Sequence, residues 1–211
     1  MTKANEDNAI CISGEVSEAA QLDHQLYGEA FYMFTLSVPR LSGAKDELPV
    51  TLPARACAEL PRVGARVRVW GQLRSYNKPA DTGNRLLITV FARTLELAGP
   101  AEPPQNEVTL SGYVCKPVVF RTTPFMREIG DMLLAVNRSY NKSDYLPCIA
   151  WGRQARFAKD LPVGAKVRIT GRLQSRVYQK VLPEGQVLER VAYEVSCAGI
   201  EQLGAPLMDR F

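Results

Sequence analysis

The residues best suited to chemistry in this sequence are basic and aromatic side chains that alternate with apolar ones between positions 166 and 178. Because successive side chains of a β-strand point to opposite faces, a strand here would bury Ala165, Val167 and Ile169. Its other face would carry Lys166, Arg168, Thr170, Arg172, Gln174, Arg176 and Tyr178. This face predicts contacts to the phosphates of a polyanion and one ring for stacking. The competing interpretation is a solvated edge strand whose charges keep it soluble.

A second group of rings lies earlier in the same half. Tyr145 and Trp151 fall on one face of a predicted strand over 145–151. The opposite face is already apolar, with Leu146, Cys148 and Ala150. The two rings are therefore free to lie outside, where an aromatic surface can stack on the bases of a nucleic acid whatever their sequence. Tyr140 lies in a polar, basic stretch at 137–142, which predicts a projecting β-hairpin arm.

These side chains need a small barrel to position them. Alternating or apolar runs predict five strands in the second half, at 108–111, 131–137, 145–151, 166–178 and 190–197. Ala155, Ala158 and Leu161 have helical spacing and predict a short helix between the third and fourth strands. This order is that of an OB fold, a partly open five-stranded barrel that binds oligonucleotides or oligosaccharides. Gly171, inside the fourth strand, fits the bend that such a barrel needs.

The first half repeats the second. Val63–Leu73 recurs as Val163–Leu173 with seven of eleven positions identical at an offset of 100. Asp46–Pro49 also matches Asp144–Pro147 at an offset of 98. A similar order at a near-constant offset predicts two copies of one domain.

We therefore expect an all-β chain of two tandem OB-fold five-stranded barrels, each with a short helix between strands 3 and 4. The expected divisions are an N-terminal domain at 1–99, a Pro-rich linker at 100–107, a C-terminal domain at 108–204 and a short tail at 205–211.

Composition narrows the function. The net charge is +4, and all the excess lies in residues 100–211, which hold 15 basic and 11 acidic residues, against 11 of each in residues 1–99. The asymmetry favours a polyanion partner for the second half. The five cysteines form no close pair, which argues against a disulfide framework or a zinc site and fits a reducing cytoplasm. No apolar run is long enough to span a membrane.

Enzyme signatures are absent from the sequence. His24 is the one histidine and lies in a polar stretch that predicts a solvated loop, and neither a P-loop nor a GxGxxG fingerprint occurs. We expect no catalysis, no cofactor and no metal site.

The second copy resembles the bacterial single-stranded DNA-binding protein family. The resemblance covers about a hundred residues and keeps the order of every strand. The matching segments are Leu110–Val114, Leu134–Arg138, Asp144–Arg153, Gly164–Arg176 and Arg190–Val195. It implies non-enzymatic, sequence-tolerant binding and protection of single-stranded DNA during replication, recombination or repair, at the nucleoid in the cytoplasm.

The resemblance also implies which residues bind. The family's four aromatic platforms fall on Tyr140, Tyr145, Trp151 and Tyr178. The cations expected to contact phosphates are Arg138, Lys142, Arg153, Lys166, Arg168, Arg172, Arg176 and Lys180.

The first copy departs from this pattern, because Ser42, Glu47, Pro53 and Lys78 stand at the four platform positions. It carries a different set of candidates for secondary contacts on its own fourth strand, namely Arg66, Arg68, Trp70, Arg74 and Tyr76. The alternative is a structural partner that binds little nucleic acid.

Assembly and partners follow from the resemblance as well. The family commonly assembles four OB barrels, so two per chain imply a homodimer that forms a four-barrel pseudo-tetramer. The last residues, Leu207–Phe211, keep the family's final Phe but lack its acidic cluster, so recruitment of replication or repair proteins by such a tail stays open. Two other functions stay open: a primosome-like OB-fold interaction module with weak nucleic-acid binding, and a nuclease, for which the sequence shows no carboxylate cluster. The choice between single-stranded DNA and RNA is also open.

Overall fold

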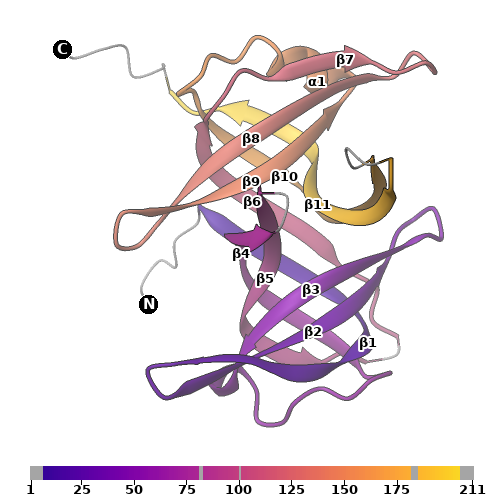
Figure 1. Cartoon of the computed structure of the whole chain (residues 1–211), viewed down its shortest axis with the longest axis vertical. Helices are drawn as coiled ribbons and strands as arrows, with labels where there is room; N and C mark the ends of the chain where they lie inside the picture. The colour runs from indigo at the N-terminus through magenta and orange to yellow at the C-terminus, as the bar shows by residue number, and fades with distance from the viewer. Residues whose placement is uncertain (1–6, 81–82, 100, 182–184, 205–211) are drawn as a thin grey trace.

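The computed structural model describes residues 7–80, 83–99, 101–181 and 185–204, and almost all of them lie in β-strands (Figure 1). The first half contains β1 (Asn8–Leu26), β2 (Glu29–Pro39), β3 (Lys45–Pro53), the 3-10 turn η1 (Ala54–Ala56), β4 (Arg66–Ala80) and β5 (Gly83–Leu97). The second half contains β6 (Asn106–Val114), β7 (Val119–Thr122), β8 (Glu128–Arg138), β9 (Lys142–Trp151), α1 (Arg153–Ala158), β10 (Lys166–Val181) and β11 (Val187–Gln202). The predicted all-β class is confirmed.

The strands close into two rings that share one hydrogen-bonded sheet. The pairing order is β2-β3-β5-β4-β1-β6-β10-β11-β9-β8-β7, with further pairings of β2 with β1 and of β6 with β8. The first five strands therefore close a ring in the order β1-β2-β3-β5-β4, and the second half closes one in the order β6-β8-β9-β11-β10. The ring order is the same in both halves. The sequence did not predict β7, an additional strand that pairs with β8.

Alternation of side chains builds the interior of each ring. On β9, Leu146, Cys148 and Ala150 are buried, as predicted, and Leu48, Val50 and Leu52 are their counterparts on β3. The long strands β4 and β10 bend at Gly71 and Gly171, where the register with the neighbouring strand shifts. A Cβ at Gly171 would lie 2.1 Å from the carbonyl oxygen of Ser196, so only glycine fits there. The bend predicted at Gly171 is confirmed.

The helix after the third ring strand differs between the halves. In the second half α1 buries Ala155 and Ala158 against the ring, although it ends before the expected position 161. The first half has only the three-residue turn η1, and none of its residues is buried. The prediction of a short helix in the first half was therefore wrong, because a helical segment this short needs a buried apolar face to be stable.

The halves are joined by an antiparallel pairing of β1 with β6. Ile10 lies opposite Val108, and Asn8 and Ile12 lie opposite Leu110 and Asn106. These positions match one another at the repeat offset of 98, so the pairing has approximate twofold symmetry around Ile10 and Val108.

The segment that links the two halves is shorter than the expected 100–107. The strand β6 already begins at Asn106. Just before it, the backbone carbonyl of Gln105 accepts a 2.9 Å hydrogen bond from the Ser13 N–H, and its own N–H donates to Ser13 Oγ at 2.7 Å. The end of the linker is thus docked on β1. Position 100 and the expected tail at 205–211 lie outside the described residues.

Two matched carboxylates fasten the halves to each other on opposite sides of this junction. Asp144 of β9 accepts a 2.9 Å hydrogen bond from the Ser75 N–H of β4, and Asp46 of β3 accepts a 2.6 Å bond from the Ser175 N–H of β10. Both carboxylates are buried. We call Asp46 and Asp144 the seam carboxylates, because each accepts a hydrogen bond from a serine N–H of the other half. They hold one ring against the other.

Candidate nucleic-acid interface

Three of the predicted binding residues lie at or beside the turn between β8 and β9. Tyr140 and Asn141 form this turn with positive φ angles of 63° and 55°, and the Tyr140 ring is almost fully exposed. Lys142 is exposed at the start of β9 and makes no ion pair with any residue that the structure describes. Arg138 is less free, because its Nη1 lies 3.6 Å from Oδ1 of the seam carboxylate Asp144.

Tyr145 lies where the two halves meet. Its backbone N–H donates a 2.7 Å hydrogen bond to Ser75 Oγ of β4, and its ring is exposed. A groove of about 320 Å³ opens at this point, and Tyr145 lines it together with Ser75, Asn77, Leu86, Leu133 and Ser143. Both halves therefore contribute to the surface beside this ring.

Trp151 ends β9 at the other end of the strand. It lies opposite Ile129 of β8 and is exposed. Gly152 follows with a positive φ of 51° and turns the chain into α1. Arg153, the first residue of α1, is exposed, and within the described ranges it has no ion pair. An aromatic ring and a cation without an ion pair among the described residues thus lie two positions apart in the sequence.

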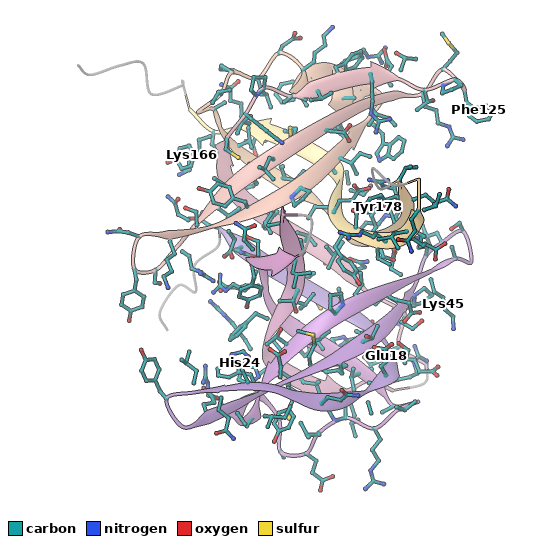
Figure 2. The ribbon with its side chains drawn as sticks, in the orientation of Figure 1. Glu18, His24, Lys45, Phe125, Lys166 and Tyr178 are labelled. Atoms are coloured by element: carbon teal, nitrogen blue, oxygen red, sulfur yellow. The ribbon has the colours of Figure 1, made fainter. Side chains whose placement is uncertain are left out.

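Tyr178 lies near the far end of β10. The guanidinium carbon of Arg176 lies 5.7 Å from the centre of its ring, and Arg176 Nε lies 3.6 Å from Glu194 Oε1. Figure 2 shows Tyr178 and Lys166 at opposite ends of the second ring. The cations and rings predicted on β10 therefore do not form one compact patch.

Three further predicted cations of β10 have partners inside the chain. The Lys166 ammonium lies 5.9 Å from the centre of the Tyr113 ring, and Arg168 Nη1 lies 4.0 Å from Glu201 Oε2. Arg172 donates a 3.3 Å hydrogen bond to Gln174 Oε1. The side chain of Lys180 lies outside the described residues.

The predicted outer face of β10 is interrupted in its middle. Gln174 was expected on that face with the cations, but it is buried and donates a 2.9 Å hydrogen bond to Glu194 Oε1 of β11. The role of Glu194 could not be predicted from the sequence of β10, because the pairing of β10 with β11 brings this carboxylate to the basic strand.

The four platform positions of the first half hold no ring. Ser42 is exposed, and Pro53 is buried opposite Phe31. Glu47 accepts hydrogen bonds from Ser17 Oγ at 2.7 Å and Ser37 Oγ at 2.6 Å. Lys78 has a side chain outside the described residues. The carboxylate of Glu47 is thus held in place on a surface that would repel phosphates.

The cations predicted for secondary contacts in the first half are engaged within the chain. Arg68 forms a salt bridge with Glu102 and lies 5.6 Å from the centre of the Trp70 ring. Arg66 donates a 3.1 Å hydrogen bond to the carbonyl oxygen of the same Glu102.

Arg74 and Tyr76 lie at the seam instead. Arg74 Nη1 donates a 2.9 Å hydrogen bond to Asp144 Oδ2 of the second half. Tyr76 is partly exposed, and burial raises the pKa of its phenol, against the opposing charges of Arg74 and Arg138. Among the first-half candidates, Tyr76 is therefore an exposed ring near charged residues of the second half, namely Arg138 of β8 and Asp144 of β9.

Two further expectations concern other chemistry. His24 lies in β1, not in the predicted loop, and its ring stacks on Phe31 with centroids 4.7 Å apart. Over the ranges that the structure describes, no group of three or more His, Cys, Asp or Glu side chains could hold a metal ion. In the same ranges, no helix has the length and apolar character that crossing a membrane requires.

Comparison with known proteins agrees with this geometry. Residues 105–201 match the model of the Single-strand binding protein family. The second half of the chain is therefore similar in sequence to this family. Single-stranded DNA-binding protein 1 of Lactococcus lactis subsp. lactis (strain IL1403) is 36% identical over 81 residues, which are 35% of this chain and 54% of that protein. Single-stranded DNA-binding protein 1 of Staphylococcus aureus (strain COL) is 34% identical over 106 residues, which are 46% of this chain and 60% of that protein.

The chain thus spans little more than half the length of these curated single-stranded DNA-binding proteins. Among solved structures, the wild-type single-stranded DNA binding protein from Thermus aquaticus superposes with a TM-score of 0.72 at 20% sequence identity. This match covers 97% of the present chain and 96% of the Thermus aquaticus chain. The shared fold therefore extends over both halves, beyond the segment that the family model matches.

Proposed function

We propose that this chain binds single-stranded DNA without sequence preference, by stacking bases on aromatic rings and contacting phosphates with Lys and Arg. One observation carries the proposal: the four rings expected to stack are all exposed on the half that matches the family, by 94% at Tyr140, 46% at Tyr145, 39% at Trp151 and 36% at Tyr178. A ring in the core would be buried, whereas a ring that stacks on bases must be open to solvent. The names of the relatives support the same ligand.

The cations around these rings suit phosphate binding to different degrees. Lys142 and Arg153 are exposed, and neither pairs with an acidic residue in the described part of the chain. Arg168 makes a long pair of 4.0 Å with the exposed Glu201, and exposed pairs of this kind contribute little, so a phosphate can replace the carboxylate. The Arg176 side chain is itself exposed, although its Nε lies 3.6 Å from the buried Glu194. These four side chains are the proposed phosphate contacts of first rank.

We further infer that the two strand rings are tandem OB-fold domains with different tasks. The same ring order in both halves and the approximate twofold pairing of β1 with β6 support the division. In this proposal the second domain binds DNA, whereas the first mainly supports it, since Arg66, Arg68 and Arg74 already have partners. The protein then protects exposed single strands during replication, recombination or repair, without an enzymatic activity of its own.

Binding is expected to weaken steeply as salt rises. Each phosphate neutralised on a single strand contributes a slope of about −0.7 to the log–log plot of affinity against salt, so four contacts give a slope of about −3. Titration of oligo-dT into the protein at several salt concentrations, followed by tryptophan fluorescence, measures this slope. Competition with duplex DNA and with single-stranded RNA at two salt concentrations determines the preferred nucleic acid.

The outcomes separate the proposal from its alternative. Stoichiometric binding of oligo-dT at low salt supports a single-stranded DNA-binding protein. Marginal binding, with no quenching and no salt dependence at micromolar protein, would contradict it and favour an OB-fold module that interacts with proteins.

The chain is expected to form a homodimer with four strand rings. This expectation comes from the resemblance to a family that commonly assembles four OB barrels, since one chain here would supply two of them. Light scattering should give a mass about twice the 23.4 kDa of the chain. A mass of one chain at micromolar concentration would contradict the proposed dimer, although it would leave the DNA-binding surface of each chain unchanged.

A further inference from the structure

The hairpin between β7 and β8 ends in two large apolar side chains that no described residue covers. Phe125 is 87% exposed and Met126 is 82% exposed. Figure 2 shows Phe125 at the outer tip of this hairpin. Burial of such side chains is normally favourable, so an ordered turn that presents both of them to solvent is an unusual use of apolar surface.

The turn itself is held by its own hydrogen bonds. The Met126 N–H donates to the carbonyl oxygen of Thr123 at 2.9 Å, and the Thr123 N–H donates to that of Arg127 at 2.9 Å. The Arg127 N–H also donates to Thr123 Oγ1 at 3.1 Å. With Pro124 at its second position, this is a tight turn followed by one residue in the left-handed region. The two apolar side chains are thus presented by a defined turn.

The residue type at the left-handed position points the same way. Met126 has a φ of 58°, a conformation that glycine adopts without strain and that other residues rarely adopt. Glycine is the usual residue at this place in such hairpins. The chain therefore keeps a large side chain at the tip where the backbone alone would favour none.

The tip lies at the end of the second ring where the proposed DNA path runs. Ile129 of β8 lies opposite Trp151, and Phe125 precedes Ile129 by four residues. At about 3.3 Å per residue of fully extended chain, Phe125 is at most roughly 13 Å beyond Trp151 along the strand direction. In Figure 2 the Phe125 tip and Tyr178 lie on the same side of the second ring. A few nucleotides of extended strand would span this separation.

The charges around the tip suit a polyanion. Arg127 is exposed beside Met126 and has no ion pair among the residues that the structure describes. Arg121 on β7 is paired with the exposed Asp131 at 2.9 Å, and Arg156 of α1 lies 3.5 Å from Glu128. Exposed pairs of this kind are weak and are readily exchanged for phosphate. A ring flanked by a free guanidinium is the combination that single-strand binding uses.

We propose that this tip is a further contact for the single strand, in which Phe125 stacks on a base beyond Trp151 and Arg127 contacts the neighbouring phosphate. The inference rests on the proposed single-stranded DNA binding and extends its path. It makes the number of nucleotides bound per chain depend on the hairpin as well as on the four rings already described.

The first half offers a matched control. Tyr27 occupies the position of Phe125 at the repeat offset of 98, at the turn between β1 and β2, and is 98% exposed. Figure 1 shows that the two hairpins extend from opposite ends of the molecule. Tyr27 is therefore an equally exposed ring that lies away from the proposed path.

The test compares Phe125→Ala, Phe125→Tyr and Tyr27→Ala with the unmodified chain, using oligo-dT of increasing length. For oligonucleotides too short to pass Trp151, all four proteins should bind equally. For longer ones, Phe125→Ala should bind about tenfold more weakly, while Phe125→Tyr and Tyr27→Ala should bind as the unmodified chain does. Because Phe125 is exposed, the thermal unfolding midpoint should stay unchanged in every variant.

Three outcomes would overturn the inference. If Phe125→Ala bound oligonucleotides of every length as tightly as the unmodified chain, the tip would not contact DNA, and a protein partner would become the better explanation of its exposed side chains. An equal loss in Tyr27→Ala would show that exposed rings act without regard to position. A loss of affinity for oligonucleotides of all lengths, short ones included, would contradict the proposed position of Phe125 beyond Trp151 on the path of the strand. Failure of the unmodified chain to bind any oligonucleotide would instead contradict the proposed function itself.

Discussion

Replacing Asp144 by alanine is expected to lower the free energy of unfolding by about 3–5 kcal/mol, because it leaves buried charge without a partner. The carboxylate accepts hydrogen bonds from the Ser75 N–H and from Arg74 Nη1, both at 2.9 Å. Arg138 Nη1 lies 3.6 Å from it. The substitution therefore strands two guanidinium groups and one backbone N–H at the seam. Urea unfolding followed by circular dichroism measures the change.

Two variants serve as controls for this result. Asp131→Ala breaks an exposed pair with Arg121 and should cost less than about 1 kcal/mol. Asp46→Ala removes the matched seam carboxylate, which bonds Arg40 and the Ser175 N–H, and should cost as much as Asp144→Ala. If Asp144→Ala changed stability no more than Asp131→Ala does, the seam carboxylates would not be what holds the two rings together.

Replacing Trp151 by alanine is expected to weaken binding of single-stranded DNA by about 1–3 kcal/mol, or roughly 5- to 150-fold in Kd. Trp151 is exposed at the end of β9, two residues before Arg153, which forms no ion pair in the part of the chain that the structure describes. Loss of the ring removes one stacking platform but leaves the neighbouring cations in place. Fluorescence anisotropy of a labelled oligo-dT measures the affinity without relying on the protein's own tryptophans.

The matched control is Phe157→Ala, which removes another exposed ring six residues further along the chain, on α1. It should leave the affinity within about twofold of the unmodified chain, since Phe157 is outside the proposed set of stacking rings. A second variant, Trp70→Phe, leaves Trp151 as the sole tryptophan, and its fluorescence should still be quenched by oligo-dT. Unchanged affinity in Trp151→Ala would remove this ring from the proposed interface.

Much of the fold was predictable because its signals are local. Alternation in the run from Tyr145 to Trp151 identifies a strand and its buried face, and the structure agrees at Leu146, Cys148 and Ala150. The bend at Gly171 was predictable for the same reason. The strand β7 was missed because it has only four exposed residues, and the pairing with β8 that defines it is a contact between segments.

The candidate site was less predictable, because its electrostatics depend on distant segments. Parity placed Arg176 and Gln174 together on β10, but the carboxylate that bonds Gln174 and pairs with Arg176 is Glu194 of β11. In the first half, Glu102 engages Arg68 in the same way from outside its strand. Such pairings determine which cations remain available to phosphates, and they cannot be predicted from the spacing of residues within one strand.

The antiparallel pairing of β1 with β6 has a consequence for how the protein behaves on dilution. Two rings that met only as separate molecules would come apart at low concentration, whereas rings in one chain face each other at an effective concentration in the millimolar range. Here the covalent connection is short and docked, since Gln105 bonds Ser13 just before β6 begins. The two closed sets of strands in one chain therefore stay paired when the protein is diluted. Selection for pairing then no longer requires two identical partners, which leaves either copy free to change its outer surface.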